Sequence, residues 1–189
     1  MSDSKKFNVH QYTKAPLRLE LIADFRASPQ ALFDIISDHN AVANWVPLMK
    51  GVFMEHSRSG GNECGVGSVR HCSLRGMGGI DETILWWSQP QGYAFKVDAK
   101  SRMMMPTREH VSVMQIEPLT DGGSRLTWQH YFNWRGLFMR HMTSIMFPMM
   151  MRKALNNIHK ELGEGSANAC HANSACETTL CKKSCSNKH

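Results

Sequence analysis

Alternation of apolar and polar residues dominates the first two thirds of the chain. Between Pro16 and Phe25 every second residue is apolar, which is the period of a strand with one buried face. Six later segments, separated by turns and loops rich in glycine or proline, also have the composition of strands: Lys50–His56, Ser68–Leu74, Ile80–Ser88, Tyr93–Ala99, Thr107–Glu117 and Arg125–Trp134. Strands joined by short turns pair as hairpins, so the pattern predicts a curved antiparallel sheet of about seven strands.

Helical signals flank this run of strands. Ser28 followed by Pro29 has the arrangement of an N-cap and a first helical residue, and a second short helix is expected over Asn40–Val46. Near the end of the chain, Leu137–Leu162 carries apolar residues at helical spacing, and Gly163 is placed to end the helix. Helices segregated to one side of an antiparallel sheet give an α+β fold.

Pro148 lies inside the long helix. A proline removes one backbone hydrogen bond and clashes with the preceding turn, so we expect a kink or a fresh helix start near Phe147. The half before that point is predicted to be a mobile lid over a pocket. The half from Met149 to Leu162 is predicted to grip the sheet.

The rest of the chain divides by composition into an arm, one domain and a tail. Residues 1–14 are polar and predicted to be a flexible N-terminal arm, residues 15–163 form the domain, and residues 164–189 are predicted to be a disordered, cysteine-rich tail. Thiolates and histidine bind soft metals, but the tail spacing suits a folded zinc site poorly. We therefore expect no metal site and no cofactor, the weak metal candidates being Cys170, Cys176, Cys181 and Cys185.

Charge and hydropathy indicate that the protein neither binds nucleic acid nor spans a membrane. The net charge is +6 and the pI about 9.1, but no Lys/Arg block is interleaved with aromatic residues, so nucleic-acid binding is not expected. There is no signal-peptide pattern and no apolar run of the ~18 residues that an integral membrane segment requires. We therefore predict a cytoplasmic protein with reduced cysteines.

Four short motifs follow one another in the order found in one superfamily. They are Ser28–Phe33 with Asp38 and Trp45–Pro47 after it, Gly65–Arg70, Asp81–Leu85 and Ser124–Trp128. With the order of strand, two helices, six strands and long helix, they resemble the SRPBCC or START-like superfamily, which includes Bet v 1-type allergens, START lipid-transfer domains and polyketide cyclases. The resemblance is to the polyketide cyclase/dehydrase-like branch and spans about Leu17–Leu162. Here His110 takes a place that is usually aromatic, and the last helix is rich in methionine rather than leucine.

The resemblance implies a helix-grip fold, in which the sheet curls round the long helix and leaves a pocket. The glutamate matching Glu82 points inward in pocket-bearing relatives, so strand parity places Ile84 and Trp86 inward and Trp87 outward. In the last strand, parity leaves open whether Gln129 and Tyr131 or the residues between them face the pocket. The predicted ligand-binding residues are Arg70, Cys72, Leu74, Glu82, Ile84, Trp86, His110, Ser112, Met114, Tyr131, Met142 and Met146.

Arg70, Glu82 and His110 are the members of that set that could pair as ions, anchor a ligand or transfer protons. Three interpretations of these residues stay open. They form a buried ion pair with His110 bonded to it, they orient the polar end of a ligand, or they do acid–base work such as dehydration of a ketide. The methionines are equally open between plain core, an adaptable pocket and an exposed docking surface.

From these features we expect the protein to bind, transport or sequester a small hydrophobic or amphipathic molecule, such as a lipid, a quinone or an aromatic polyketide. The first alternative is a cyclase or dehydratase that uses Glu82 or His110 as general acid or base. The second is a protein–protein interaction module that docks through its methionine-rich helix or its glycine-rich loop.

Overall fold

The computed structural model describes residues 7–55, 64–76, 78–100, 105–164 and 170–171, and its main elements follow the predicted order. They are the 3-10 helix η1 (Val9–Gln11), β1 (Leu17–Phe25), α1 (Pro29–Ser37), α2 (Val42–Trp45), β2 (Met49–Glu55), β3 (Val69–Leu74), β4 (Gly78–Ser88), β5 (Gly92–Ala99), β6 (Thr107–Pro118), β7 (Ser124–Trp134), α3 (Leu137–Glu161) and β8 (Cys170–His171). The seven predicted strands and three predicted helices are all present, which confirms the α+β class.

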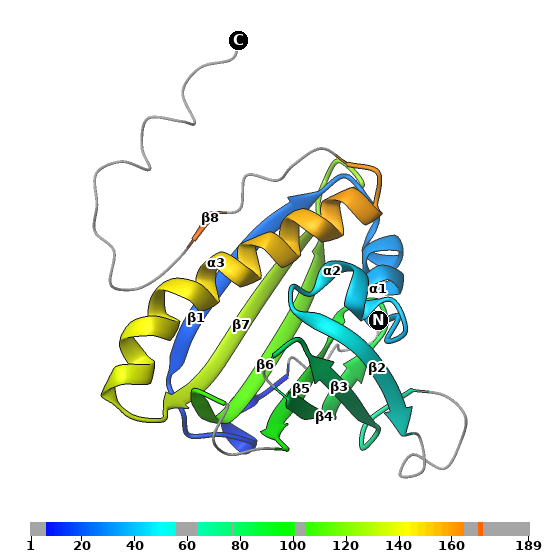
Figure 1. Cartoon of the computed structure of the whole chain (residues 1–189). Helices are drawn as coiled ribbons and strands as arrows, with labels where there is room; N and C mark the ends of the chain where they lie inside the picture. The colour runs from blue at the N-terminus through cyan, green and yellow to red at the C-terminus, as the bar shows by residue number, and fades with distance from the viewer. Residues whose placement is uncertain (1–6, 56–63, 77, 101–104, 165–169, 172–189) are drawn as a thin grey trace, which may run out of the picture.

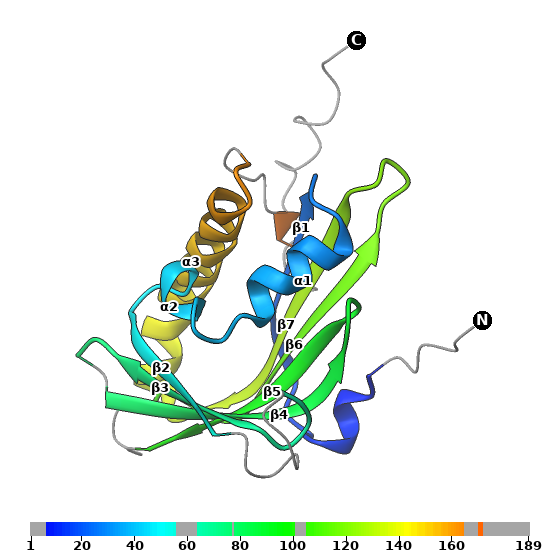
Figure 2. The same cartoon turned by 90° about the vertical axis from the view of Figure 1, so that its right-hand side faces the viewer.

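The strands form one antiparallel sheet in the order β2-β3-β4-β5-β6-β7-β1-β8. The sheet curls round α3, which lies along its concave side, and α1 and α2 lie beside that helix (Figures 1 and 2). This arrangement is the predicted helix-grip fold. No helix in the described part of the chain is long and apolar enough to span a membrane.

The core lies between the concave face of the sheet and the three helices. Leu21 of β1, Leu126 of β7 and Leu155 of α3 are each completely buried in it. Burial of apolar surface at about 25 cal/mol per Å² is the main force that holds α3 on the sheet. A second, smaller apolar cluster covers part of the outer face, around Val111 and Val113.

Local signals in the sequence act as predicted at the helix ends. The Ser28 hydroxyl accepts a hydrogen bond from the backbone N–H of Ala31 (3.3 Å), and Pro29 begins α1. Gly163 follows the end of α3 with a φ of 70°, the left-handed conformation common after a helix. The Tyr93 hydroxyl of β5 donates to the Ile36 carbonyl (2.8 Å), so the end of α1 is tied to the sheet.

A β-bulge in β4 reverses two predicted orientations. The pairing of β4 with β5 shifts between Ile84 and Trp86, so the residues after the bulge change faces. Trp87, predicted to point outward, packs on the main core and lies against the Phe33 ring, with centroids 5.2 Å apart. Trp86, predicted to face the pocket, packs on the outer cluster instead.

The described part of the N-terminal segment packs on the sheet, so the prediction of a flexible arm is wrong from residue 7 onward. The Phe7 ring stacks on Trp86 at a centroid distance of 5.6 Å, and Val9 is buried in the outer cluster. The Thr13 hydroxyl donates to the Glu109 carbonyl (3.2 Å). The reason is the bulge in β4, which turns Trp86 outward and gives this segment an aromatic surface to cover.

The long helix and the tail each depart in part from expectation. α3 continues through Pro148 as one helix without a fresh start, and its ribbon bends along its length (Figure 1). In its first half Leu137 and Ile145 are exposed, whereas Leu155 and Ile158 beyond Pro148 are fully buried. Of the tail predicted to be disordered, Cys170–His171 pairs with β1 as β8, and Cys176, Cys181 and Cys185 lie outside the described residues.

Gly92 at the start of β5 should not tolerate a side chain. Its φ is 129°, and a Cβ there would lie 2.0 Å from the Met114 carbonyl oxygen. We expect Gly92→Ala to lower the free energy of unfolding by at least about 2 kcal/mol in urea denaturation, because backbone strain adds to the clash. Gly122 is the matched control, since its φ is 87° but nothing lies within 4 Å of an added Cβ. Equal losses for both alanine variants would contradict this account.

Candidate ligand-binding site

A cavity of about 200 Å³ lies between the concave face of the sheet and α3. Its wall comes from β2 to β7, from α2 and the segment after it, from the residues just before β6, and from the first half and middle of α3. Most lining side chains are apolar: Trp45, Val46, Pro47, Leu48, Met49, Leu74, Ile80, Phe95, Val97, Met105, Pro106, Trp128, Met146, Phe147, Met150 and Met151. The polar ones are Arg70, Glu82, Thr107, His110, Ser112, His130 and Thr143.

Half of the twelve predicted site residues line this cavity: Arg70, Leu74, Glu82, His110, Ser112 and Met146. Cys72, Ile84 and Met114 face the same side but are buried in the core cluster. Trp86 and Tyr131 are wrong, because both pack on the outer cluster. The side chain of Met142 lies outside the described part of the chain. Whether the lining residues bind a ligand stays a prediction.

Arg70 and Glu82 form an ion pair in the wall of the cavity. They are register partners on β3 and β4, and both the Nε and the Nη2 of Arg70 lie 2.5 Å from Glu82 Oε2. The two side chains are only 2% and 7% exposed. Burial opposes the charge of Arg70, but Glu82 together with smaller contributions from Tyr93 and Cys72 outweighs burial, and the pKa of the guanidinium is raised. The pair therefore enters the apolar wall as a neutral unit.

His39 extends this pair toward a cysteine, and the sequence analysis named neither residue as a site candidate. Arg70 Nη1 donates to His39 Nδ1 (2.9 Å), so that nitrogen carries no proton and the imidazole is neutral. The other nitrogen, Nε2, lies 2.9 Å from Cys64 Sγ. Burial raises the pKa of the Cys64 thiol. A neutral imidazole brings no positive charge to the sulfur, and burial therefore keeps Cys64 as a thiol.

His110 pairs with a second histidine, which parity in β7 could not select. His110 Nε2 lies 3.1 Å from His130 Nδ1, and the two rings are 5% and 3% exposed. The interpretation that His110 bonds to the Arg70–Glu82 pair is therefore wrong. Burial lowers the pKa of His110 to about 4, and burial together with His110 lowers the pKa of His130 well below its ordinary value. Both imidazoles are neutral at pH 7.

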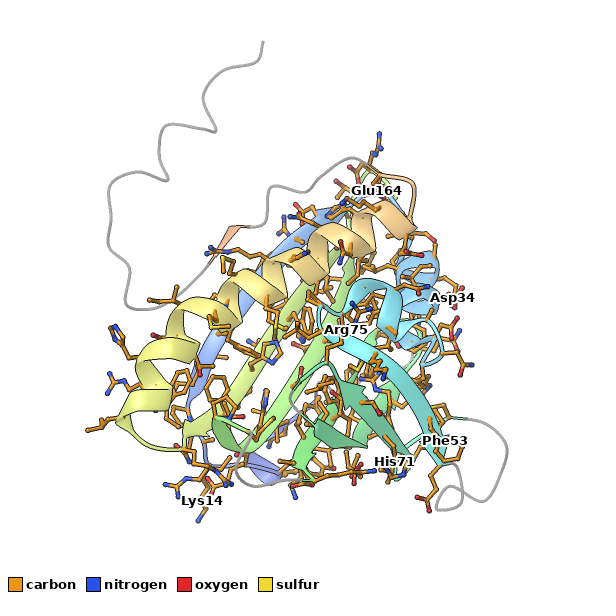
Figure 3. All side chains as sticks on the ribbon, in the orientation of Figure 1. Lys14, Asp34, Phe53, His71, Arg75 and Glu164 are labelled. Atoms are coloured by element: carbon orange, nitrogen blue, oxygen red, sulfur yellow. The ribbon has the colours of Figure 1, made fainter. Side chains whose placement is uncertain are left out.

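Another histidine, His71 of β3, shows the opposite behaviour outside the cavity. His71 lies between Asp81 (2.7 Å) and Glu55 (3.2 Å) and stacks on Phe53, beside which it is labelled in Figure 3. The hydrogen bond that the His71 ring donates to Asp81 raises the pKa of His71, because the neighbouring carboxylates favour the charged ring. The pKa of His71 is raised, whereas the pKa values of His110 and His130 are lowered. The difference comes from the environment, because the cavity histidines are buried and His71 lies beside carboxylates near the surface.

Removal of the charge of Glu82 should be costly. In Glu82→Gln the Arg70 cation would stay buried without a counter-charge, and we expect the free energy of unfolding to fall by about 3–5 kcal/mol. Asp24→Asn is the matched control, because Asp24 and Arg125 form a bidentate pair whose side chains are 50% and 43% exposed. That change should cost less than about 1 kcal/mol in the same urea titration. Similar losses at both sites would show that Arg70 is not confined in the interior.

The buried histidine pair should make the protein less stable in mild acid. An unfolded histidine takes up a proton near pH 6.5, whereas folded His110 does so near pH 4, so stability is lost as the pH falls through that window. For His110 alone the loss reaches about 3 kcal/mol. We expect the double variant His110→Phe/His130→Phe to lose less stability between pH 7 and pH 4.

His71→Gln is the control for this titration, and it has the opposite sign. Because the folded pKa of His71 is raised, its contribution is present at low pH and fades as the pH rises through the folded value. The His71→Gln variant should therefore lose more of its free energy of unfolding than the unchanged protein as the pH falls from 7 to 4. The account is contradicted if the His110→Phe/His130→Phe variant retains the full acid loss in chemical denaturation at each pH.

Comparison with known proteins places the chain among proteins of this architecture. The START superfamily protein from Mycobacterium smegmatis matches with a TM-score of 0.60 at 14% identity, over 78% of this chain and 99% of that one. The protein XoxI from Bacillus cereus matches with a TM-score of 0.60 at 15% identity, over 75% and 92%. Ara h 8.0201 matches with a TM-score of 0.53 at 13% identity, over 75% and 96%. At these identities the likeness concerns the fold alone.

Sequence comparison gives the family. A comparison with curated protein sequences gave no significant match. The model of the family described as "Polyketide cyclase / dehydrase and lipid transport" matches residues 17–163, which is nearly the whole domain and excludes most of the segments before β1 and after α3. The chain belongs to this polyketide cyclase/dehydrase and lipid transport family.

Proposed function

We propose that the protein binds a small hydrophobic or amphipathic molecule in the cavity between its sheet and α3. The observation that carries the proposal is the cavity of about 200 Å³ with a largely apolar wall and a few polar side chains. Small-molecule sites are typically concave and apolar, with a small number of polar groups that orient the ligand. Transport or sequestration would both follow from such binding.

The state of the polar groups favours binding over acid–base catalysis. A general acid or base works best when its pKa lies near the working pH. Glu82 is held in an ion pair with Arg70, and burial holds the pKa of His110 at about 4, so that His110 does not have a pKa suited to proton transfer near pH 7. Ligand binding does not require a pKa near the working pH, because apolar contact supplies the affinity.

A larger side chain in the cavity wall tests this function. Val97 lines the cavity, and Val97→Phe would fill part of it. We expect the variant to bind the neutral fluorescent probe N-phenyl-1-naphthylamine at least tenfold more weakly than the unchanged protein, a difference of about 1.4 kcal/mol. Saturating probe should also raise the melting temperature of the unchanged protein, because a ligand of the folded state stabilises it.

Val66→Phe is the control, since Val66 is 57% exposed and does not line the cavity. It should bind the probe as the unchanged protein does. The proposal fails if the probe binds all three proteins equally, because binding would then occur elsewhere. It also fails if the probe binds none of them.

A further inference from the structure

Several buried polar atoms at the cavity have no partner among the described residues. They are His110 Nδ1, His130 Nε2, Thr107 Oγ1 and Trp45 Nε1, and all four side chains line the cavity. Leaving a buried donor or acceptor unsatisfied costs about 1–3 kcal/mol. Buried groups of this kind call for an explanation, and a missing hydrogen-bond partner that enters the cavity is one that also fits their position.

The two outer ring nitrogens of His110 and His130 always present one hydrogen-bond donor and one acceptor. Each neutral imidazole carries one N–H, and one of the two N–H groups is used in the bond from ring to ring. If His110 Nε2 donates that bond, His130 Nε2 is left with a proton and His110 Nδ1 with a lone pair. If His130 Nδ1 donates it, the two roles are exchanged. In both cases one outer nitrogen donates and the other accepts, and a hydroxyl group is complementary to either.

The charge of the wall disfavours an anion. Among the described side chains that line the cavity, only Arg70 and Glu82 carry a charge, and they neutralise each other. An ionised carboxylate or phosphate would lose its hydration without meeting a free cation, which is costly in an apolar site. A neutral polar group loses far less on the same transfer.

The volume limits the size of the ligand. An engineered cavity of 150 Å³ with an apolar lining binds benzene in another protein. A cavity of about 200 Å³ therefore suits a compact molecule of one to three rings and is too small for a lipid with two acyl chains. The flat aromatic surfaces of Trp45, Phe95 and Trp128 in the wall suit a ring compound.

We propose that the ligand is a compact neutral ring compound whose hydroxyl group hydrogen-bonds to the His110–His130 pair. The inference rests on the binding function proposed above and names the chemical class for that site. Phe147 of α3 packs against both imidazoles, with centroids 5.9 Å from His110 and 4.9 Å from His130. Since the outer nitrogens are buried, side chains packed around them, such as Phe147, must shift when the hydroxyl reaches them.

Fluorescence titration of the full chain at pH 7 with three matched probes tests this class. The probes are naphthalene, 2-naphthol and 2-naphthoate, which share two rings and differ only in having no polar group, a hydroxyl or an anion. We expect 2-naphthol to bind at least tenfold more tightly than naphthalene, and 2-naphthoate to bind most weakly. In the His110→Phe/His130→Phe variant the affinity for 2-naphthol should fall to that for naphthalene, while naphthalene binding changes less than threefold.

Each other outcome overturns a distinct part of the account. Equal binding of naphthalene and 2-naphthol leaves the cavity function standing but overturns the hydroxyl anchor. Tightest binding of 2-naphthoate overturns the neutral class. Failure of all three probes overturns this inference, and the proposed function fails with it only if N-phenyl-1-naphthylamine does not bind either. If the double variant does not fold, the three affinities of the unchanged protein still test the inference. In that case the imidazole nitrogen resonances of the unchanged protein should shift in NMR spectra on addition of 2-naphthol but not on addition of naphthalene.

Discussion

The packing of α3 against the concave face of the sheet is the contact on which the rest of the structure depends. Beyond Pro148 the helix buries Met151, Ala154, Leu155 and Ile158 among residues of the sheet and of α1 and α2. Before Pro148 it carries the exposed residues Leu137 and Ile145 and covers the cavity with Met146 and Phe147. One helix thus closes the core with its second half and covers the cavity with its first half and with Met150 and Met151.

Two polar arrangements lie in this apolar wall, and they differ in how well their hydrogen bonds are satisfied. Arg70 and Glu82 meet as register partners, and their opposite charges cancel within the wall. His110 and His130 hydrogen-bond to each other, and one nitrogen of each has no hydrogen-bond partner among the described residues. Apolar rings of similar shape at the two histidine positions would avoid that unsatisfied cost, so the pair adds little to stability. A role in recognition accounts for its presence better than a role in holding the fold.

The sequence contained enough information for the fold and for part of the site. The order of the strands, the cap at Ser28 and the stop at Gly163 depend on local rules, and the structure follows them. The resemblance to pocket-bearing relatives, extended by strand parity, placed Arg70, Glu82 and His110 at the cavity. Parity failed at Trp86, because a bulge adds one residue to one strand and exchanges the two faces beyond it. Nothing in the local pattern of β4 marks the position of that bulge.

Contacts between segments that are distant in the sequence were the second feature that the sequence pattern could not predict. His39 reaches Arg70 from the connection between α1 and α2, and the segment around Phe7 finds Trp86 on the outer face. These contacts depend on how the elements are arranged in space rather than on the pattern within any one of them. In β7 the apolar character of both faces left the parity open, and the structure places His130 at the cavity and Tyr131 on the outer face.

The central claim is that a small molecule enters the cavity under α3, and methionine methyl resonances report on it most directly. Met150 and Met151 line the cavity, whereas Met54 of β2 does not line it and Met149 is 64% exposed. The account predicts that saturating 2-naphthol shifts the methyl resonances of Met150 and Met151 in NMR spectra and leaves those of Met54 and Met149 in place. Shifts confined to Met54 or Met149, or no shift at any methionine, would contradict it.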